Sequence, residues 1–217
     1  MKEQNNTEQL QAMFYFSSAI YVIEKPKFLE ISKKVCNEKL KKIKKEKKLD
    51  EIYPVYMTDN LFDDERMKEV VQYILDTGWN ILQSQGYNMA NFQTTFTEMW
   101  CQEHYKHSSM EQHTHNGGVQ LVGFYFLDCP EKCPNVVFHD PKAGKVQINL
   151  PEADMSQATF ASNMINFTPK DGMLMFSNSW LPHSFTRNGA TKPMRFIHFN
   201  IAIQNAPAVC MTPPEII

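Results

Sequence analysis

Residues 110–127, MEQHTHNGGVQLVGFYFL, place His113 and His115 one residue apart, just before a run of apolar and aromatic residues. Such a run predicts a buried β-strand, and residues i and i+2 of a strand point to the same face. If the strand includes the histidine pair, the two imidazoles converge on one point in space. The stretch therefore predicts a β-fold with two histidines at the mouth of one strand.

The chain after Asn91 continues in short β-rich runs. Turn signals such as NGG, KAG, PKDG and RNGATKP separate them. This spacing favours a sandwich, jelly roll or barrel over βαβ units. The runs are FQTTFTEMWCQ, VQLVGFYFL, NVVFH, KVQINL, MINFT, GMLMFS, HSFT and MRFIHFNIAI.

Two helices are predicted before this β-region. Residues 27–48 are rich in lysine and have apolar residues at helical spacing, which predicts an amphipathic helix with an exposed lysine face. Residues 61–85 predict a second helix, with Asp59 or Asn60 as its N-cap and Gly86 after its end. A short strand or two is expected in AMFYFSSAIYVIEK, ahead of both helices.

Length and composition favour one soluble domain. The 217 residues are 42% hydrophobic and carry a formal charge of −2, so nucleic acid is an unlikely partner. The five cysteines are too few and too scattered for a disulfide framework. No signal peptide is visible and no apolar run approaches the ~20 residues of a membrane span. We therefore expect a cytoplasmic protein that does not contact membranes.

A third histidine, His183 in NSWLPHSF, follows the predicted strand GMLMFS. A β-barrel site can take two ligands from one strand and a third from a distant strand that neighbours it in space. Neutral imidazoles suit Fe(II), zinc and nickel, and three protein ligands leave coordination positions open for catalysis. The alternative is that HTH is a pair of solvated surface histidines.

Arg195, in KPMRFIHFN, is one of only three arginines in a chain that otherwise uses lysine. An arginine binds a carboxylate through two parallel hydrogen bonds, which lysine cannot do. If its side chain points into the barrel, Arg195 is a candidate for binding a carboxylate there. A surface salt bridge at the strand end is the other interpretation.

The segments HTH, FYFL, FHDP, DGMLMFSNSWLPHSF and MRFIHFN, in this order, resemble the 2-oxoglutarate- and Fe(II)-dependent oxygenases of the prolyl-4-hydroxylase-like branch. They are similar in particular to a small subfamily found in marine bacteria and tailed phages, and the resemblance covers nearly the whole chain. It implies Fe(II) and 2-oxoglutarate as cofactors, with His113 and His183 as iron ligands. It also implies that Arg195 and Tyr125 hold the far carboxylate of 2-oxoglutarate.

One position departs from the superfamily. Most members have a carboxylate two residues after the first iron ligand, where this chain has His115. A three-histidine iron site is chemically reasonable and is similar to that of thiol dioxygenases. Asp140, in VVFHDP, is the alternative carboxylate ligand.

The fold class implied is mostly β with flanking helices: a double-stranded β-helix, a cupin-like jelly roll, packed against two N-terminal helices. We predict a single domain over residues 1–217. It divides into an N-terminal strand and helical flank (10–90), the β-core (91–204) and an irregular tail (205–217).

The function implied is a hydroxylase. It would couple decarboxylation of 2-oxoglutarate to succinate with C–H hydroxylation by O₂ of a peptide, amino acid or other small substrate. Two alternatives stay open: a cupin-type three-histidine dioxygenase without 2-oxoglutarate, and a non-catalytic metal-binding or assembly protein. A homodimer is possible, and a phage-encoded protein would work in the host cytoplasm. Candidates for lining a substrate groove, or simply for core packing, are Trp100, Gln102, Tyr105 and Trp180.

Overall fold

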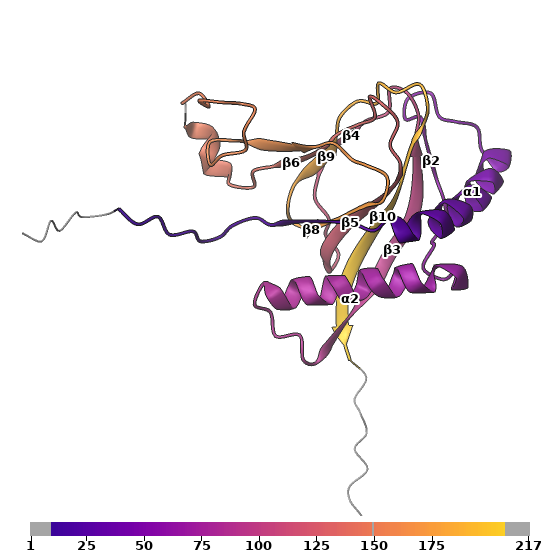
Figure 1. Cartoon of the computed structure of the whole chain (residues 1–217), viewed down its shortest axis with the longest axis horizontal. Coiled ribbons are helices and arrows are strands. Elements are labelled where there is room, and N and C mark those ends of the chain that lie inside the picture. The colour runs from indigo at the N-terminus through magenta and orange to yellow at the C-terminus, as the bar shows by residue number, and fades with distance from the viewer. Residues whose placement is uncertain (1–9, 149, 207–217) are drawn as a thin grey trace, which may run out of the picture.

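The structure is a computed structural model that describes residues 10–148 and 150–206 (Figure 1). Its α-helices are α1 (Leu29–Glu46) and α2 (Lys68–Ser84), and short 3-10 helices lie at Pro26–Phe28, Glu65–Met67 and Ala143–Gln147. Its strands are β1 (Ile20–Glu24), β2 (Val55–Met57), β3 (Phe92–His104), β4 (Met110–His113), β5 (Val119–Asp128), β6 (Val136–His139), β7 (Met164–Phe167), β8 (Met173–Asn178), β9 (His183–Phe185) and β10 (Met194–Asn205).

These strands form two antiparallel sheets. One has the order β1-β8-β5-β10-β3-β2, and the other has the order β4-β9-β6-β7. From β4 onward the chain passes repeatedly from one sheet to the other, and only β6 and β7 are consecutive strands in the same sheet. This alternation produces a jelly roll. The fold class predicted from the sequence, a double-stranded β-helix with two flanking helices, is confirmed.

Both helices pack on the outer face of the six-stranded sheet. Helix α2 crosses β3 and β10 (Figure 1), and α1 lies beside β2. Alternate residues of the strands face the helices and build one apolar core with them, which includes Val35, Leu40, Val70, Ile74, Ile81, Tyr125, Leu174, Ile197 and Phe199. The intervening residues face the smaller sheet and build a second core, which includes Val122, Phe124, Phe126, Met175, Met194 and Phe196.

The helices lie close to where the sequence predicted them, with one shift. Helix α2 begins at Lys68 rather than near residue 61. The reason is local: the side chain of Asp64 accepts a hydrogen bond from the backbone N–H of Arg66 at 3.1 Å and caps the 3-10 turn that leads into α2. Helix α1 buries Val35 and Leu40 and exposes most of its lysines, as an amphipathic helix should.

The described residues of the run KVQINL do not form a strand. Its first half belongs to the 3-10 helix Ala143–Gln147, in the segment that joins β6 to β7. Ile148 and Leu150 are 61% and 80% exposed, and β6 already pairs with β7 and β9. Its described residues pair with no strand, although β7 leaves an edge of the smaller sheet free, so tertiary structure rather than propensity decides their conformation.

The N-terminal strand and the tail are described only in part. Of the predicted N-terminal β-residues, Ile20–Glu24 form β1, which pairs with β8. Strand β10 ends at Asn205, and residues 207–217 of the predicted tail lie outside the described residues. The division of the chain at 10–90, 91–204 and 205–217 stays a prediction. None of the described helices is long and apolar enough to cross a membrane.

His104 lies in the core between the two sheets. Its ring stacks on those of Phe196 and Phe185, at centroid distances of 5.2 and 6.3 Å. Its nitrogens pair with Gln102 Oε1 at 2.7 Å and with Ser108 Oγ at 3.2 Å. Burial lowers the pKa of His104 to about 4, because the charged form would lose its hydration.

This burial predicts acid sensitivity. The folded-state pKa lies below the unfolded value of about 6.5, so the unfolded state binds the proton more tightly, and stability present above pH 6.5 is lost as the pH falls toward 4. We expect His104 to account for about 2 kcal/mol of the stability lost between pH 7 and pH 5. In urea unfolding, the free energy of unfolding of His104→Gln should fall by about 2 kcal/mol less than that of the wild type between pH 7 and pH 5. The exposed His107→Asn is the control, and equal losses in wild type and His104→Gln would contradict the prediction.

Gly123, in the middle of β5, has no room for a side chain. A Cβ there would lie 2.2 Å from the ring of Phe199 and 2.4 Å from the carbonyl oxygen of Met175. Gly123→Ala should therefore lower the free energy of unfolding by about 3 kcal/mol in urea titrations. In Gly78→Ala the new Cβ would lie 2.9 Å from the flexible end of Ile201 and 3.5 Å from that of Leu121. Because these side chains can move and alanine favours the helix, we expect a change within about 1 kcal/mol. Similar effects of the two changes would refute this packing.

Candidate metal centre

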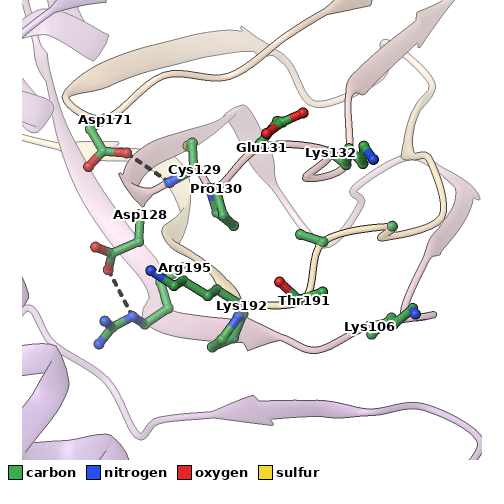
Figure 2. A pocket seen from close by; sticks show the side chains of 13 residues that line it. Lys106, Asp128, Cys129, Pro130, Glu131, Lys132, Asp171, Thr191, Lys192 and Arg195 are labelled. Atoms are coloured by element: carbon green, nitrogen blue, oxygen red, sulfur yellow. Dashed lines mark hydrogen bonds and ion pairs between the residues drawn. The ribbon is translucent and has the colours of Figure 1, made fainter.

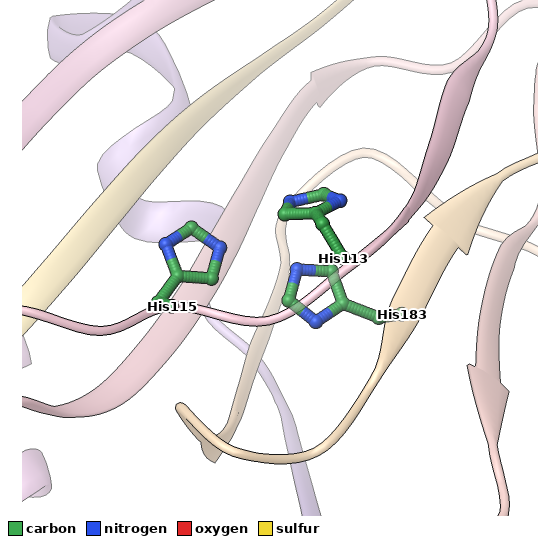
Figure 3. A group of neighbouring side chains, drawn as sticks. All are labelled: His113, His115 and His183. Atoms are coloured by element: carbon green, nitrogen blue, oxygen red, sulfur yellow. The ribbon is translucent and has the colours of Figure 1, made fainter.

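Three histidines meet where β4 pairs with β9 (Figure 3). His113 ends β4 and lies directly opposite His183, the first residue of β9. His115 follows two residues later, and its backbone N–H donates to the carbonyl oxygen of Ser179 at 2.9 Å. One ligand nitrogen from each ring lies within 4.8 Å of the other two. The three imidazoles can therefore converge on a single metal ion.

The histidine pair does not lie on one continuous strand, as the sequence had suggested. Strand β4 ends at His113, and β5 begins at Val119 in the other sheet. Between them Gly117 and Gly118 have φ values of 67° and 85°, a conformation that glycine adopts without strain. His115 thus comes from the loop between the sheets, and the turn rather than strand alternation brings it to the other histidines.

Hydrogen bonds orient two of the rings. The Nδ1–H of His113 faces the carbonyl oxygen of Glu111 at 2.8 Å, and the Nδ1–H of His183 faces that of Leu181 at 3.0 Å. Donation from Nδ1 leaves the lone pair on Nε2, which is the arrangement found in metal-binding histidines. The Nε2 atoms of His115 and His183 are buried and have no hydrogen-bond partner among the described residues. A metal ion would satisfy both.

Burial also keeps the rings neutral. It lowers the pKa of His183 to about 3 and that of His115 to about 4, and the neighbouring His113 lowers the pKa of His115 further. The rings of Phe124 and Phe138 lie 5.6 and 6.0 Å from that of His183 and make one wall of the site apolar. Neutral imidazoles are the form that binds metal, so at neutral pH these two need not lose a proton first.

A fourth histidine, His198 on β10, lies behind His115 and was not selected from the sequence. The two rings are 5.2 Å apart and nearly parallel, and the ring of Trp100 on β3 lies 4.7 Å from His198. Burial lowers the pKa of His198 well below its usual value. The available signal was strand alternation, because His198 is two residues from Phe196 and therefore faces the same way.

Arg195 and Tyr125 face away from the histidines, which corrects their predicted placement. The Nε of Arg195 lies 2.8 Å from Asp128 and 3.8 Å from the buried Glu103, and its Nη1 donates to Asn37 on α1. The hydroxyl of Tyr125 donates to the carbonyl oxygen of Lys25 at 2.7 Å. Both residues lie at positions of their strands from which the side chains point toward the helices. Neither side chain lies beside the histidines in this structure, and their role in holding a carboxylate stays a prediction.

Arg195 instead lines a cavity of about 830 Å³ that does not include the histidines (Figure 2). The ion pair between Arg195 and Asp128 forms part of its wall, and the side chain of Asp171 accepts a hydrogen bond from the backbone N–H of Cys129 at 2.7 Å. Three lysines also line it: Lys106, Lys132 and Lys192.

The remaining candidates divide between the core and the surface. Asp140, the alternative ligand, pairs with Lys145 at 2.9 Å and is not part of the histidine cluster. Trp100 contacts the ring of His198, which in turn stacks on that of His115. Gln102 is bonded to His104 in the core. Tyr105 packs against Tyr56 at 5.9 Å on the α1 side, and Trp180 is 48% exposed.

The cavity beside the histidines has a volume of about 360 Å³. Three histidines, two of them with buried and unpartnered Nε2 atoms, fit Fe(II). The surroundings fit 2-oxoglutarate less obviously, because no lysine or arginine of the described residues lines this cavity, and aromatic rings fill the barrel next to it. The lining residues are Thr97, Glu98, His113, Thr114, His115, Asn116, Gly117, Val119 and Asn200, and the filling rings are Phe124, Phe126, Phe138, Phe185 and Phe196.

The sequence of the β-core matches a known family. Residues 98–200, from β3 to β10, match the family described as "Putative 2OG-Fe(II) oxygenase". This segment contains all three histidines of the cluster. Fe(II) and 2-oxoglutarate are the cofactors that this family implies. No curated protein matches the chain in sequence.

Solved structures with the same fold are distant in sequence. AviO1 from Streptomyces viridochromogenes Tue57 has a TM-score of 0.60 at 11% identity, over 91% of this chain and 92% of that one. A Pseudomonas putida prolyl-4-hydroxylase has a TM-score of 0.55 at 9% identity, over 85% and 93%. HygX from Streptomyces hygroscopicus, crystallised with nickel and 2-oxoglutarate, has a TM-score of 0.55 at 11% identity, over 85% and 83%. The resemblance inferred from the sequence is therefore confirmed: residues 98–200 match the oxygenase family, and the chain has the fold of these solved structures.

Proposed function

We propose that this protein is a 2-oxoglutarate- and Fe(II)-dependent hydroxylase, which couples decarboxylation of 2-oxoglutarate to succinate with C–H hydroxylation of a peptide, amino acid or other small molecule. The observation that carries the proposal is the cluster of three imidazoles within 4.8 Å, two with buried and unpartnered Nε2 atoms. The cluster lies inside the segment that matches the oxygenase family. Protein side chains alone cannot oxidise a C–H bond with O₂, so a metal at this point supplies what the fold lacks.

His113, His115 and His183 are the residues proposed to hold Fe(II). Bound together, iron and 2-oxoglutarate supply the activation of O₂. The chain contributes the orientation of the three rings, through the carbonyl oxygens of Glu111 and Leu181. It also contributes the apolar wall of Phe124 and Phe138, which keeps water from one side of the metal. Because the three ligands are neutral, the two negative charges of 2-oxoglutarate would balance those of Fe(II).

A second candidate is a three-histidine dioxygenase that does not use 2-oxoglutarate. The composition of the histidine cavity favours it, since no described lysine or arginine lines that cavity and Arg195 is committed to Asp128 on the other face. The two candidates share the metal site and differ in whether 2-oxoglutarate binds to the metal. Spectroscopy of the bound metal can therefore separate them.

We predict that anaerobic Fe(II), followed by 2-oxoglutarate, produces a visible metal-to-ligand charge-transfer band in the wild type. His115→Ala and His183→Ala should weaken iron binding more than about 100-fold and abolish the band, because each removes a ligand. Asp140→Ala should retain the band, since Asp140 lies outside the cluster. Iron binding without a band would reject the 2-oxoglutarate proposal in favour of the second candidate. No iron binding would reject both.

Arg195→Ala tests the corrected placement in the same experiment. We expect the band to survive and the free energy of unfolding to fall by about 3 kcal/mol, because Glu103 is buried and loses one of its two cationic neighbours. Loss of the band in a folded Arg195→Ala protein would restore the predicted role of Arg195 in binding 2-oxoglutarate.

The location and the assembly state stay predictions from the sequence. We propose a cytoplasmic protein, in the host cytoplasm if a phage encodes it, with a homodimer as one possible state. Light scattering of the purified protein would test the homodimer, because it measures the mass of the particle against 25.2 kDa for one chain.

A further inference from the structure

Two β-bulges shape the wall of the histidine cavity. On β10, Asn200 pairs with Glu98 of β3, but the next residue, Ile201, pairs with Phe96, so Thr97 is an extra residue. On the other side of β10, Ile201 pairs with Leu121 and Ala202 pairs with Val119, so Gln120 is extra in β5. Both bulges lie at the same level of β10. Bulges re-aim side chains and are common beside active sites.

The first bulge leaves Glu98 in the cavity wall, where a neighbour holds its carboxylate in place. The Nδ2 of Asn200, directly across the strand pair, donates to Glu98 Oε2 at 2.8 Å. Asn200 is only 4% exposed, whereas Glu98 is exposed. A carboxylate accepts hydrogen bonds only, so Asn200 must present its NH₂ group to Glu98. The other carboxylate oxygen, Oε1, has no hydrogen-bond partner among the described residues.

Among the described residues that line this cavity, Glu98 is also the one acidic side chain. The other polar groups there are hydroxyls, amides and imidazoles. Fe(II), a doubly charged 2-oxoglutarate and three neutral histidines sum to zero charge. Glu98 would then be the uncompensated charge at the mouth of the site, which favours a cationic ligand and disfavours a second anion.

We propose that the substrate carries a protonated amine or guanidinium, and that Glu98 binds this group at the mouth of the cavity. Binding there would place the carbon chain of the substrate beside His113 and His115, which line the same cavity. The inference rests on the proposed function, because it takes the histidine cluster as the metal site. Glu98 is thus a substrate-binding residue, held in position by Asn200.

The test uses three small probes and the full-length protein. Protein loaded with Mn(II) and 2-oxoglutarate is titrated with Nα-acetyl-lysine methylamide, with its Nε-acetylated neutral form, and with Nα-acetyl-glutamate methylamide. The paramagnetic relaxation of the probe protons reports binding near the metal, and Zn(II)-loaded protein provides the diamagnetic reference. Metal content is measured in every sample. The variants are Glu98→Gln and Glu98→Lys, with Glu131→Gln, which lines the other cavity, as the matched control.

We expect the lysine probe to bind at least about threefold more tightly than the neutral probe, as for a partly exposed charged pair. Glu98→Gln should remove this preference, Glu98→Lys should reverse it toward the glutamate probe, and Glu131→Gln should change nothing. Equal relaxation of the lysine and neutral probes in metal-loaded wild type would overturn the inference and leave the proposed function intact.

Two further outcomes would also overturn it. If Glu98→Gln weakens Mn(II) binding but leaves the preference among the probes unchanged, Glu98 balances the charge of the metal rather than that of a substrate. If the wild type binds no Mn(II) at all, the proposed function fails, and the substrate inference fails with it.

Discussion

Strand β10 is paired along its length, with β5 on one side and β3 on the other, and the alternation of its side chains divides the molecule into two cores. Residues of one parity, including Ile197 and Phe199, meet the helices. Residues of the other parity, including Phe196 and His198, face the smaller sheet and the metal centre. A residue paired on both sides cannot turn over without breaking two ladders of hydrogen bonds. This constraint decides which polar residues can reach the site.

The same alternation explains why Arg195 contacts the helical layer rather than the metal centre. Arg195 faces α1, where it meets two carboxylates, Asp128 and Glu103, and Lys44 of α1 meets the second of these. These charges join the helical layer to the sheet. On the opposite parity the barrel contains aromatic rings and neutral histidines. Ion pairs thus hold the helices to the outer face of the sheet, whereas the side chains in the interior of the barrel beside the metal centre are apolar or imidazole rings.

The two sides of the metal centre differ in polarity. Phenylalanines cover the side toward the barrel, and the side toward solvent opens into the cavity that contains Glu98. Since low polarity strengthens electrostatic interactions, a single carboxylate at this opening influences which ligands approach. The large cavity beside Arg195 has a mixed lining, in which three lysines and Arg195 stand beside Asp128, Glu131 and Asp171.

By itself, the sequence determined the class of fold and the three histidines. These inferences rest on hydrophobic periodicity, on turn residues and on the order of HTH and PHSF. Such features can be read from the sequence without knowing which strands pair. Tertiary structure alone decided the face on which each strand residue lies, because one bulge or one residue of register reverses it. That is why Arg195 and Tyr125 were misplaced and His198 and Glu98 were overlooked. It is also why the described residues of KVQINL, a plausible strand by composition, form no strand: a strand exists only where another strand supplies its hydrogen bonds.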